Sequence, residues 1–68
     1  MIPPEALDFG EYRKFTSYDK FPGLPPKATP LLIKETKLWT FVLAFFNGEG
    51  IVFAWDKVSP LYNIYQGL

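Results

Sequence analysis

The most prominent pattern in the chain is an apolar run from Leu38 to Trp55, interrupted by Asn47-Gly48-Glu49-Gly50. A long apolar run is typical of a membrane-spanning helix, whereas a turn sequence between two apolar stretches is typical of a β-hairpin. The run therefore has two interpretations, one helix or two strands.

A single helix over residues 30–58 has well-defined ends. Thr29 would cap its N-terminus, and Pro30 would take the first helical position, where a missing N–H costs nothing. Ser59-Pro60 would end the helix, because a residue before proline avoids the α region. The helix would be roughly 43 Å long, which matches a bilayer with headgroups of about 40–45 Å. The pattern favours this interpretation and predicts a mainly α chain with a single transmembrane helix.

The helix interpretation gives particular side chains a role. Trp39 and Trp55 would anchor the two membrane interfaces, where tryptophan is enriched. Glu49 would lie near the middle of the bilayer as a buried carboxyl that is neutral or paired. A stripe of small residues, with a polar residue beside it, would pack against another helix. These helix-packing residues are Thr40, Ala44, Gly48 and Asn47.

The hairpin interpretation makes residues 47–50 the turn, with Thr40 to Phe46 and Ile51 to Val58 as the arms. Asn-Gly between apolar stretches is the strongest short-range hairpin signal, and the β-branched and aromatic residues of the arms suit strands. Both arms are apolar on both faces, so the hairpin would need cover on two sides, and an isolated hairpin is marginally stable at best. The alternative prediction is a small, soluble β-hairpin interaction module.

The segments on either side of the run differ from it in composition. Six of the seven prolines lie in residues 1–30, which excludes one long helix there. We expect residues 1–29 to form an extended arm, rich in proline and aromatic residues, that lies on a partner, with room for a short helix between Glu5 and Tyr18. Residues 59–68 are expected to form a short C-terminal tail.

Composition limits the chemistry. The chain has 68 residues without cysteine or histidine, which removes disulfides, thiolate metal sites and the commonest general base. Seven basic and seven acidic residues give a net charge of zero. A nucleic-acid-binding protein would have a surplus of basic residues, so the charge argues against that class. The sequence has neither a glycine-rich phosphate loop nor a Ser/His or Cys/His pair. We therefore expect no catalysis, no metal and no cofactor, and a small chain that needs partners for stability.

Glu49 is the one candidate for special chemistry. Within a membrane its carboxyl could relay protons or bind the magnesium of a pigment. As a turn residue or a paired carboxyl, it would be structural. Structural ion pairs also perturb carboxyl groups, so the structural interpretation is favoured.

A resemblance to a known family covers residues 17–54. Residues 30–54 are similar to the small single-span subunit VIIc of cytochrome c oxidase, which is subunit VIII in fungi, and residues 17–23 resemble that family's acidic, aromatic Pro-Gly start. The similarity has two parts. A proline precedes the apolar and basic residues with which the family's helix begins, and aromatic residues precede a Gly-x-Gly sequence. The matching residues are Pro30, Lys34, Phe45, Phe46, Gly48, Gly50 and Ile51. The chain departs from the family at residues 1–16, at Glu49 and in lacking a basic tail.

The resemblance implies a structural accessory subunit of a membrane-bound electron-transfer complex, without catalytic residues or cofactor ligands of its own. Its partners would be the other subunits and the lipid bilayer, in the mitochondrial inner membrane. A small subunit of another respiratory or photosynthetic complex, the latter in the thylakoid membrane, would have the same architecture. The soluble hairpin module is the alternative from a different class.

Overall fold

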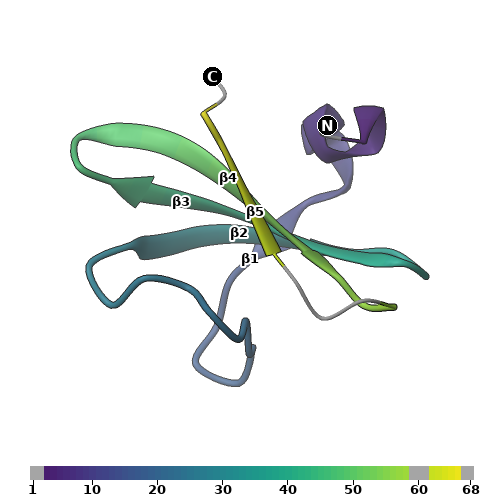
Figure 1. Cartoon of the computed structure of the whole chain (residues 1–68), viewed down its shortest axis with the longest axis horizontal. Coiled ribbons are helices and arrows are strands. Elements are labelled where there is room, and N and C mark those ends of the chain that lie inside the picture. The colour runs from purple at the N-terminus through teal and green to yellow at the C-terminus, as the bar shows by residue number, and fades with distance from the viewer. Residues whose placement is uncertain (1–2, 59–61, 67–68) are drawn as a thin grey trace.

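The computed structural model describes residues 3–58 and the backbone of residues 62–66. Its main feature is a five-stranded antiparallel sheet in which each strand pairs with its neighbours in the sequence (Figure 1). Two short 3-10 turns, η1 (Pro4–Leu7) and η2 (Phe9–Glu11), precede the sheet. The strands are β1 (Arg13–Lys14), β2 (Thr29–Glu35), β3 (Trp39–Phe46), β4 (Glu49–Asp56) and β5 (Tyr62–Gln66).

The predicted transmembrane helix over residues 30–58 is wrong. This stretch forms β2, β3 and β4, and no described residue lies in an α-helix. Within the described part of the chain, no helix is long and apolar enough to cross a bilayer. The fold class is therefore mostly β instead of mainly α. The expected localisation in the mitochondrial inner membrane or the thylakoid membrane is contradicted together with the helix.

The turn after Phe46 explains why strands form in place of a helix. Asn47 and Gly48 have φ angles of 52° and 80°, the left-handed backbone of a type I′ hairpin turn. Asn and Gly adopt this conformation more readily than other residues. From Phe46↔Glu49 to Trp39↔Asp56, β3 and β4 pair along their whole length. The hairpin alternative is thus the structure observed, with a turn of two residues, Asn47 and Gly48, instead of four.

Both faces of the sheet are covered by the chain itself. Residues 15–28, between β1 and β2, cover one face, here called the loop face, with Phe21 and Ala28 as buried contacts. The turns η1 and η2 cover the opposite face, here called the N-terminal face, where Ala6 is buried. Figure 1 shows the N-terminal turns and the loop on opposite sides of the sheet. This double cover explains why both arms of the hairpin are apolar on both faces.

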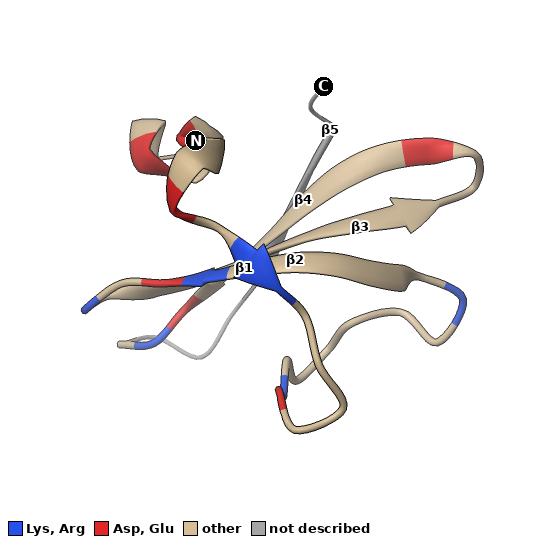
Figure 2. Ribbon diagram, turned by 180° about the vertical axis from the view of Figure 1, so that it is seen from behind, with Lys and Arg blue, Asp and Glu red and all other residues tan. Residues whose placement is uncertain are grey.

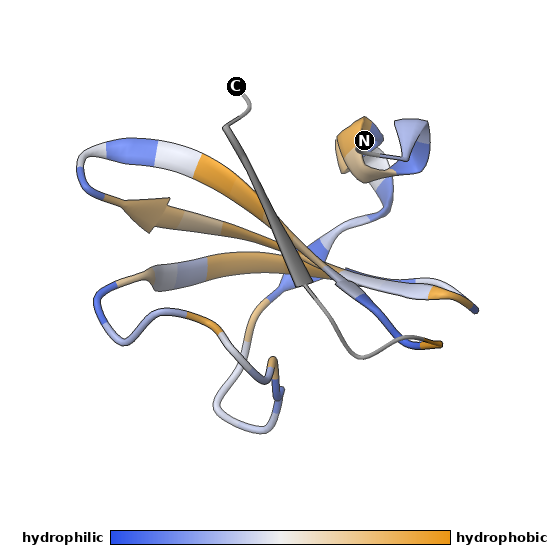
Figure 3. Cartoon of the chain, viewed as in Figure 1, coloured by the Kyte–Doolittle hydropathy of each residue, from blue (hydrophilic) through white to orange (hydrophobic). Residues whose placement is uncertain are grey.

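The strands supply two apolar clusters, one for each face, because successive side chains of a strand point to opposite sides. The apolar colour in Figure 3 accordingly follows β3 and β4. Phe53 is fully buried on the loop face and Phe41 on the N-terminal face. The other buried apolar strand residues are Ile33, Val42, Ala44 and Ile51 on the loop face and Val52 and Ala54 on the N-terminal face.

The flanking segments also belong to the folded unit. The described residues of the expected N-terminal arm fold back onto the sheet, and the stretch from Glu5 to Tyr18 holds two 3-10 turns and β1 in place of one helix. Pro30 lies within β2, where the register shifts between Pro30 and Leu32, as suits a residue without a backbone donor. Part of the expected C-terminal tail forms β5 and pairs with β4.

Candidate interaction surface

The residues predicted to pack against another helix belong to the β3–β4 hairpin. Thr40 and Ala44 lie on the same face of β3 and are buried, with Ala44 inside the loop-face cluster. Asn47 and Gly48 are exposed in the turn. The structure therefore brings Thr40 and Ala44 to one face of the chain's own core and places Asn47 and Gly48 at the end of the hairpin.

The two predicted anchors, Trp39 and Trp55, lie at the same end of the hairpin but on opposite faces. Trp39 stacks on Phe41 with the ring centroids 5.7 Å apart. Trp55 meets Phe21 edge to face at 6.4 Å. Both tryptophans are half-buried, so they close the two apolar clusters at this end.

Glu49, the predicted buried carboxyl, is exposed at the start of β4. It lies beside the turn, where water solvates the charge. Within the described part of the chain, no group of three or more acidic side chains could hold a metal ion.

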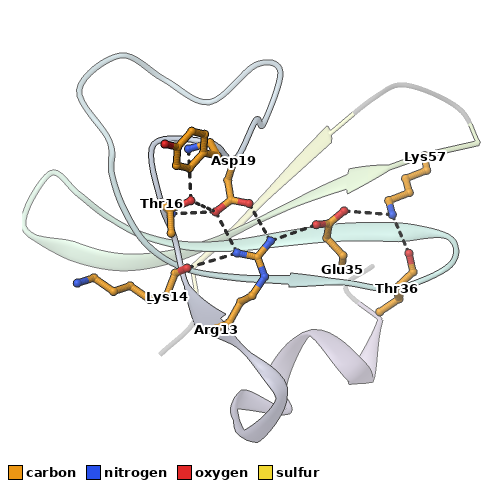
Figure 4. Close-up of polar contacts among 8 residues, drawn as sticks. Arg13, Lys14, Thr16, Asp19, Glu35, Thr36 and Lys57 are labelled. Carbon is orange, nitrogen blue, oxygen red and sulfur yellow. Dashed lines mark hydrogen bonds and ion pairs between the residues drawn. The ribbon is translucent and has the colours of Figure 1, made fainter.

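The most extensive polar network joins the loop to β1 and β2 (Figure 4). Arg13 binds Asp19 with two hydrogen bonds, of 2.7 and 3.0 Å, and also donates to Glu35 at 3.4 Å. Glu35 lies 3.7 Å from the Nζ of Lys57, which donates to the carbonyl oxygen of Thr36 at 2.9 Å. The network therefore connects the loop, β1 and the end of β2 with the segment after β4.

Asp19 is the centre of this network at the loop. Its carboxylate accepts hydrogen bonds from Arg13 and from both the backbone N–H and the hydroxyl of Thr16. These bonds, that from Arg13 above all, hold the pKa of Asp19 well below its usual range. Because Arg13 and Thr16 both bind the Asp19 carboxylate, the network fastens the loop over the sheet.

A second polar contact fastens the N-terminal turns to the sheet. Lys34 of β2 is buried, and its Nζ donates to the carbonyl oxygen of Glu5 at 2.6 Å and lies 5.9 Å from the centroid of the Tyr12 ring. The Tyr12 hydroxyl donates to the carbonyl oxygen of Ala6 at 2.7 Å. Burial raises the pKa of Tyr12 to about 12. These contacts satisfy backbone carbonyls of the 3-10 turns, so they are structural.

Among the described residues, the exposed apolar side chains are spread over several elements, and one of them, Leu31, is in β2. Phe45 lies near the turn at one end of the hairpin, whereas Leu38 and Val58 lie at the other end. Leu7 is exposed in η1, and Tyr18, 90% exposed, is in the loop. Single exposed apolar residues are normal on a protein surface. The edges of the sheet are therefore the stronger candidates.

The hydrogen-bond alternation of antiparallel strands shows which backbone groups are left over at each edge. Phe46 and Glu49 flank a two-residue turn, so they form a hydrogen-bonded pair. Along β4, alternate residues then direct their backbone groups toward β3. Val52 and Ala54 direct theirs away from β3 and toward β5.

The same alternation continues into β5. Val52 pairs with Tyr65 and Ala54 with Asn63, so the backbone groups of Tyr65 and Asn63 are used by β4. The alternate residues of β5 direct their N–H and C=O groups to the outer edge, and no other strand of the described chain pairs with this edge. These residues are Tyr62, Ile64 and Gln66.

The opposite edge of the sheet is protected. β1 has only two residues, Arg13 and Lys14, and both are basic, which Figure 2 shows as a block of positive charge. Short length and charge are common protections of a sheet edge against further pairing. β5 has five residues, Tyr62 to Gln66, and includes neither a charge nor a proline. Within the described sheet, the outer edge of β5 is therefore the longer and less protected edge.

Comparison with known protein families, curated proteins and solved structures finds no significant match to this chain. The resemblance of residues 17–54 to subunit VIIc thus stays a prediction that no match tests, while the helix it implies is contradicted by β2, β3 and β4. The evidence for function comes from the surface of the chain itself.

The sequence did not identify the edge of β5 as a site. Residues 62–66 contain two tyrosines and an isoleucine, which favour strands. That signal is short and follows Ser59-Pro60, so the sequence alone predicts a tail there. The importance of the segment depends on its place at the end of the sheet order, which no local pattern encodes.

Proposed function

We propose that the chain is a non-catalytic interaction module that binds another polypeptide strand along the outer edge of β5. The observation that carries this proposal is the row of backbone groups at Tyr62, Ile64 and Gln66, which point away from β4 and which no other described strand pairs with. An exposed sheet edge accepts an extended strand through main-chain hydrogen bonds, the mode called β-augmentation. The incoming strand would become the next strand of the sheet.

The contrast between the two edges supports this function. At the β1 edge, an incoming strand would meet two basic residues and little backbone. At the β5 edge, it would meet five uncharged residues. The small size of the folded sheet supports it as well, because a sheet of five short strands buries a limited share of its surface and gains stability from a partner.

A photocrosslinking experiment tests the proposal. Benzoylphenylalanine replaces Tyr62 in one variant and Tyr18 in a matched control, since Tyr18 is a highly exposed tyrosine remote from β5 in the sequence. We expect irradiation in cells that produce the protein to give covalent adducts to protein from position 62 and few from position 18. Equal adduct formation from both positions, or none from position 62, would contradict the function.

A further inference from the structure

We infer that the strand bound by β5 is β5 of a second copy of this chain, paired antiparallel about a two-fold axis at Ile64. This inference rests on the proposed function and adds the identity of the partner and the register. This pairing would make the sheet of one copy continuous with the sheet of the other.

The outward backbone groups fit such a pairing. They belong to Tyr62, Ile64 and Gln66, which are symmetric about Ile64. With the two-fold axis there, Ile64 of each copy exchanges both hydrogen bonds with Ile64 of the other. Tyr62 of each copy does the same with Gln66 of the other. Every outward N–H and C=O group of β5 thus gains a partner from one symmetry operation.

Charge also fits a second copy. An isologous interface presents the same patch on both copies, so a charge near the axis would meet the same charge. β5 contains no charged residue, so this repulsion does not arise. At the β1 edge, self-pairing would bring together Lys14 of both copies and would crowd Arg13, which already binds Asp19 and Glu35.

The pairing of β5 with β5 also limits the assembly to two copies. If β5 of one copy paired with the β1 edge of the next, the contact would be head-to-tail and could repeat into a filament. The short, basic β1 edge opposes that contact. Pairing β5 with β5 uses up the open edge in both copies, so assembly ends at a dimer. Because only five residues per copy take part, we expect a dimer that depends on concentration.

Single cysteines test the register, because the chain has no cysteine of its own. Opposed hydrogen-bonded residues have Cα atoms about 5.5 Å apart, within the disulfide range of about 4.4–6.8 Å. Tyr62 of one copy would lie roughly 14 Å along the strand from Tyr62 of the other. Under mild oxidation, Ile64→Cys should give a disulfide-linked dimer, and Tyr62→Cys alone should not.

A mixed sample provides a second test that leaves Ile64 in place. Tyr62→Cys and Gln66→Cys should form the heterodimeric disulfide when they are mixed, while each alone should stay mostly unlinked. Light scattering of the unmodified chain should show a monomer that becomes a dimer as concentration rises. Circular dichroism of each variant checks that the sheet is retained.

The outcomes separate this inference from the proposed function. A chain that stays monomeric at every concentration overturns self-pairing. Adducts to other proteins from position 62 would still support the proposed function. A dimer that forms no disulfide with Ile64→Cys or with the mixed pair overturns the register. Linkage at position 64 and in the mixed pair, but not at position 62 alone, supports both the partner and the register.

Discussion

Lys34 is a lysine whose role is to fasten one segment of the chain to another. It is 6% exposed, and its described hydrogen bond goes to the carbonyl oxygen of Glu5 and not to a carboxylate. Its aliphatic stem is therefore buried between the sheet and the N-terminal turns. A long charged side chain in such a place contributes packing as well as charge.

We predict that Lys34→Ala lowers the free energy of unfolding by about 1–3 kcal/mol, since it removes the buried stem and one of the two hydrogen bonds to the Glu5 carbonyl, the other being from the backbone N–H of Asp8. Lys34→Met keeps most of the stem and should lose less. Lys27→Ala, at an exposed position, is the control and should be neutral. Urea denaturation measures all three. A Lys34→Ala variant as stable as the control would show that this contact does not hold the turns in place.

Tyr12 makes stability depend on pH in the alkaline range. Its pKa is about 12 in the folded chain against 10.0 for an ordinary tyrosine, because burial disfavours the phenolate. The unfolded chain therefore loses this proton first as pH rises. The stability linked to Tyr12 is present below pH 10 and is lost as pH rises toward 12.

We predict that Tyr12→Phe reduces this alkaline loss of stability. At neutral pH the same variant should cost about 0.5–1.5 kcal/mol, because the carbonyl of Ala6 loses its hydroxyl donor. Thermal denaturation at several pH values measures both effects, with Tyr18→Phe as the control at an exposed tyrosine. If Tyr12→Phe and the unchanged chain lost the same stability as pH rises from 10 to 12, that loss would not come from Tyr12.

At the scale of the elements, the turn at Asn47 and Gly48 sets the register of the central hairpin. Its two residues have positive φ angles, which glycine adopts without strain. A Cβ atom at Gly48 would meet no other atom within 4 Å, so the cost of a side chain there comes from the backbone alone.

We predict that Gly48→Ala lowers the free energy of unfolding by about 1–2 kcal/mol through left-handed backbone strain. Gly10→Ala is the matched control, since its Cβ would make only an ordinary contact of 3.5 Å with Asp8. Chemical denaturation compares the two. Equal stability of the two variants would show that the turn is not left-handed at Gly48.

Glu49 distinguishes the hairpin from the spanning helix by mutation. Because it is exposed beside the turn, we predict that Glu49→Lys and Glu49→Gln are tolerated equally, each within about 0.5 kcal/mol of the unchanged chain. A carboxyl at the middle of a bilayer would tolerate Gln but not Lys. Selective destabilisation by Lys, seen in denaturation curves, would contradict the exposed position.

At the scale of the whole molecule, the sequence predicted some features because their causes are local. The Asn47-Gly48 turn and the strand-forming residues around it can be recognised from the sequence alone. The preference for a helix arose because Thr29-Pro30 and Ser59-Pro60 resemble helix ends and because the arms are apolar on both faces. What covers those faces, Phe21 and Ala28 on one side and Ala6 on the other, comes from distant parts of the chain.

The open edge could be found only from the complete strand order. Residues 62–66 become an edge because four strands precede them in one antiparallel sheet, and their outward groups follow from the alternation that begins at the Asn47-Gly48 turn. β5 therefore pairs with β4 on one side, and no described strand pairs with it on the other.

Amide hydrogen exchange, measured by NMR in dilute protein, tests this claim most directly. The amides of Asn63 and Tyr65, which bond to β4, should exchange slowly, and those of Tyr62 and Ile64 should exchange quickly. As concentration rises and copies pair, the two fast amides should become protected. Equal protection of all four amides in dilute protein, or the reverse alternation, would contradict an open edge at β5.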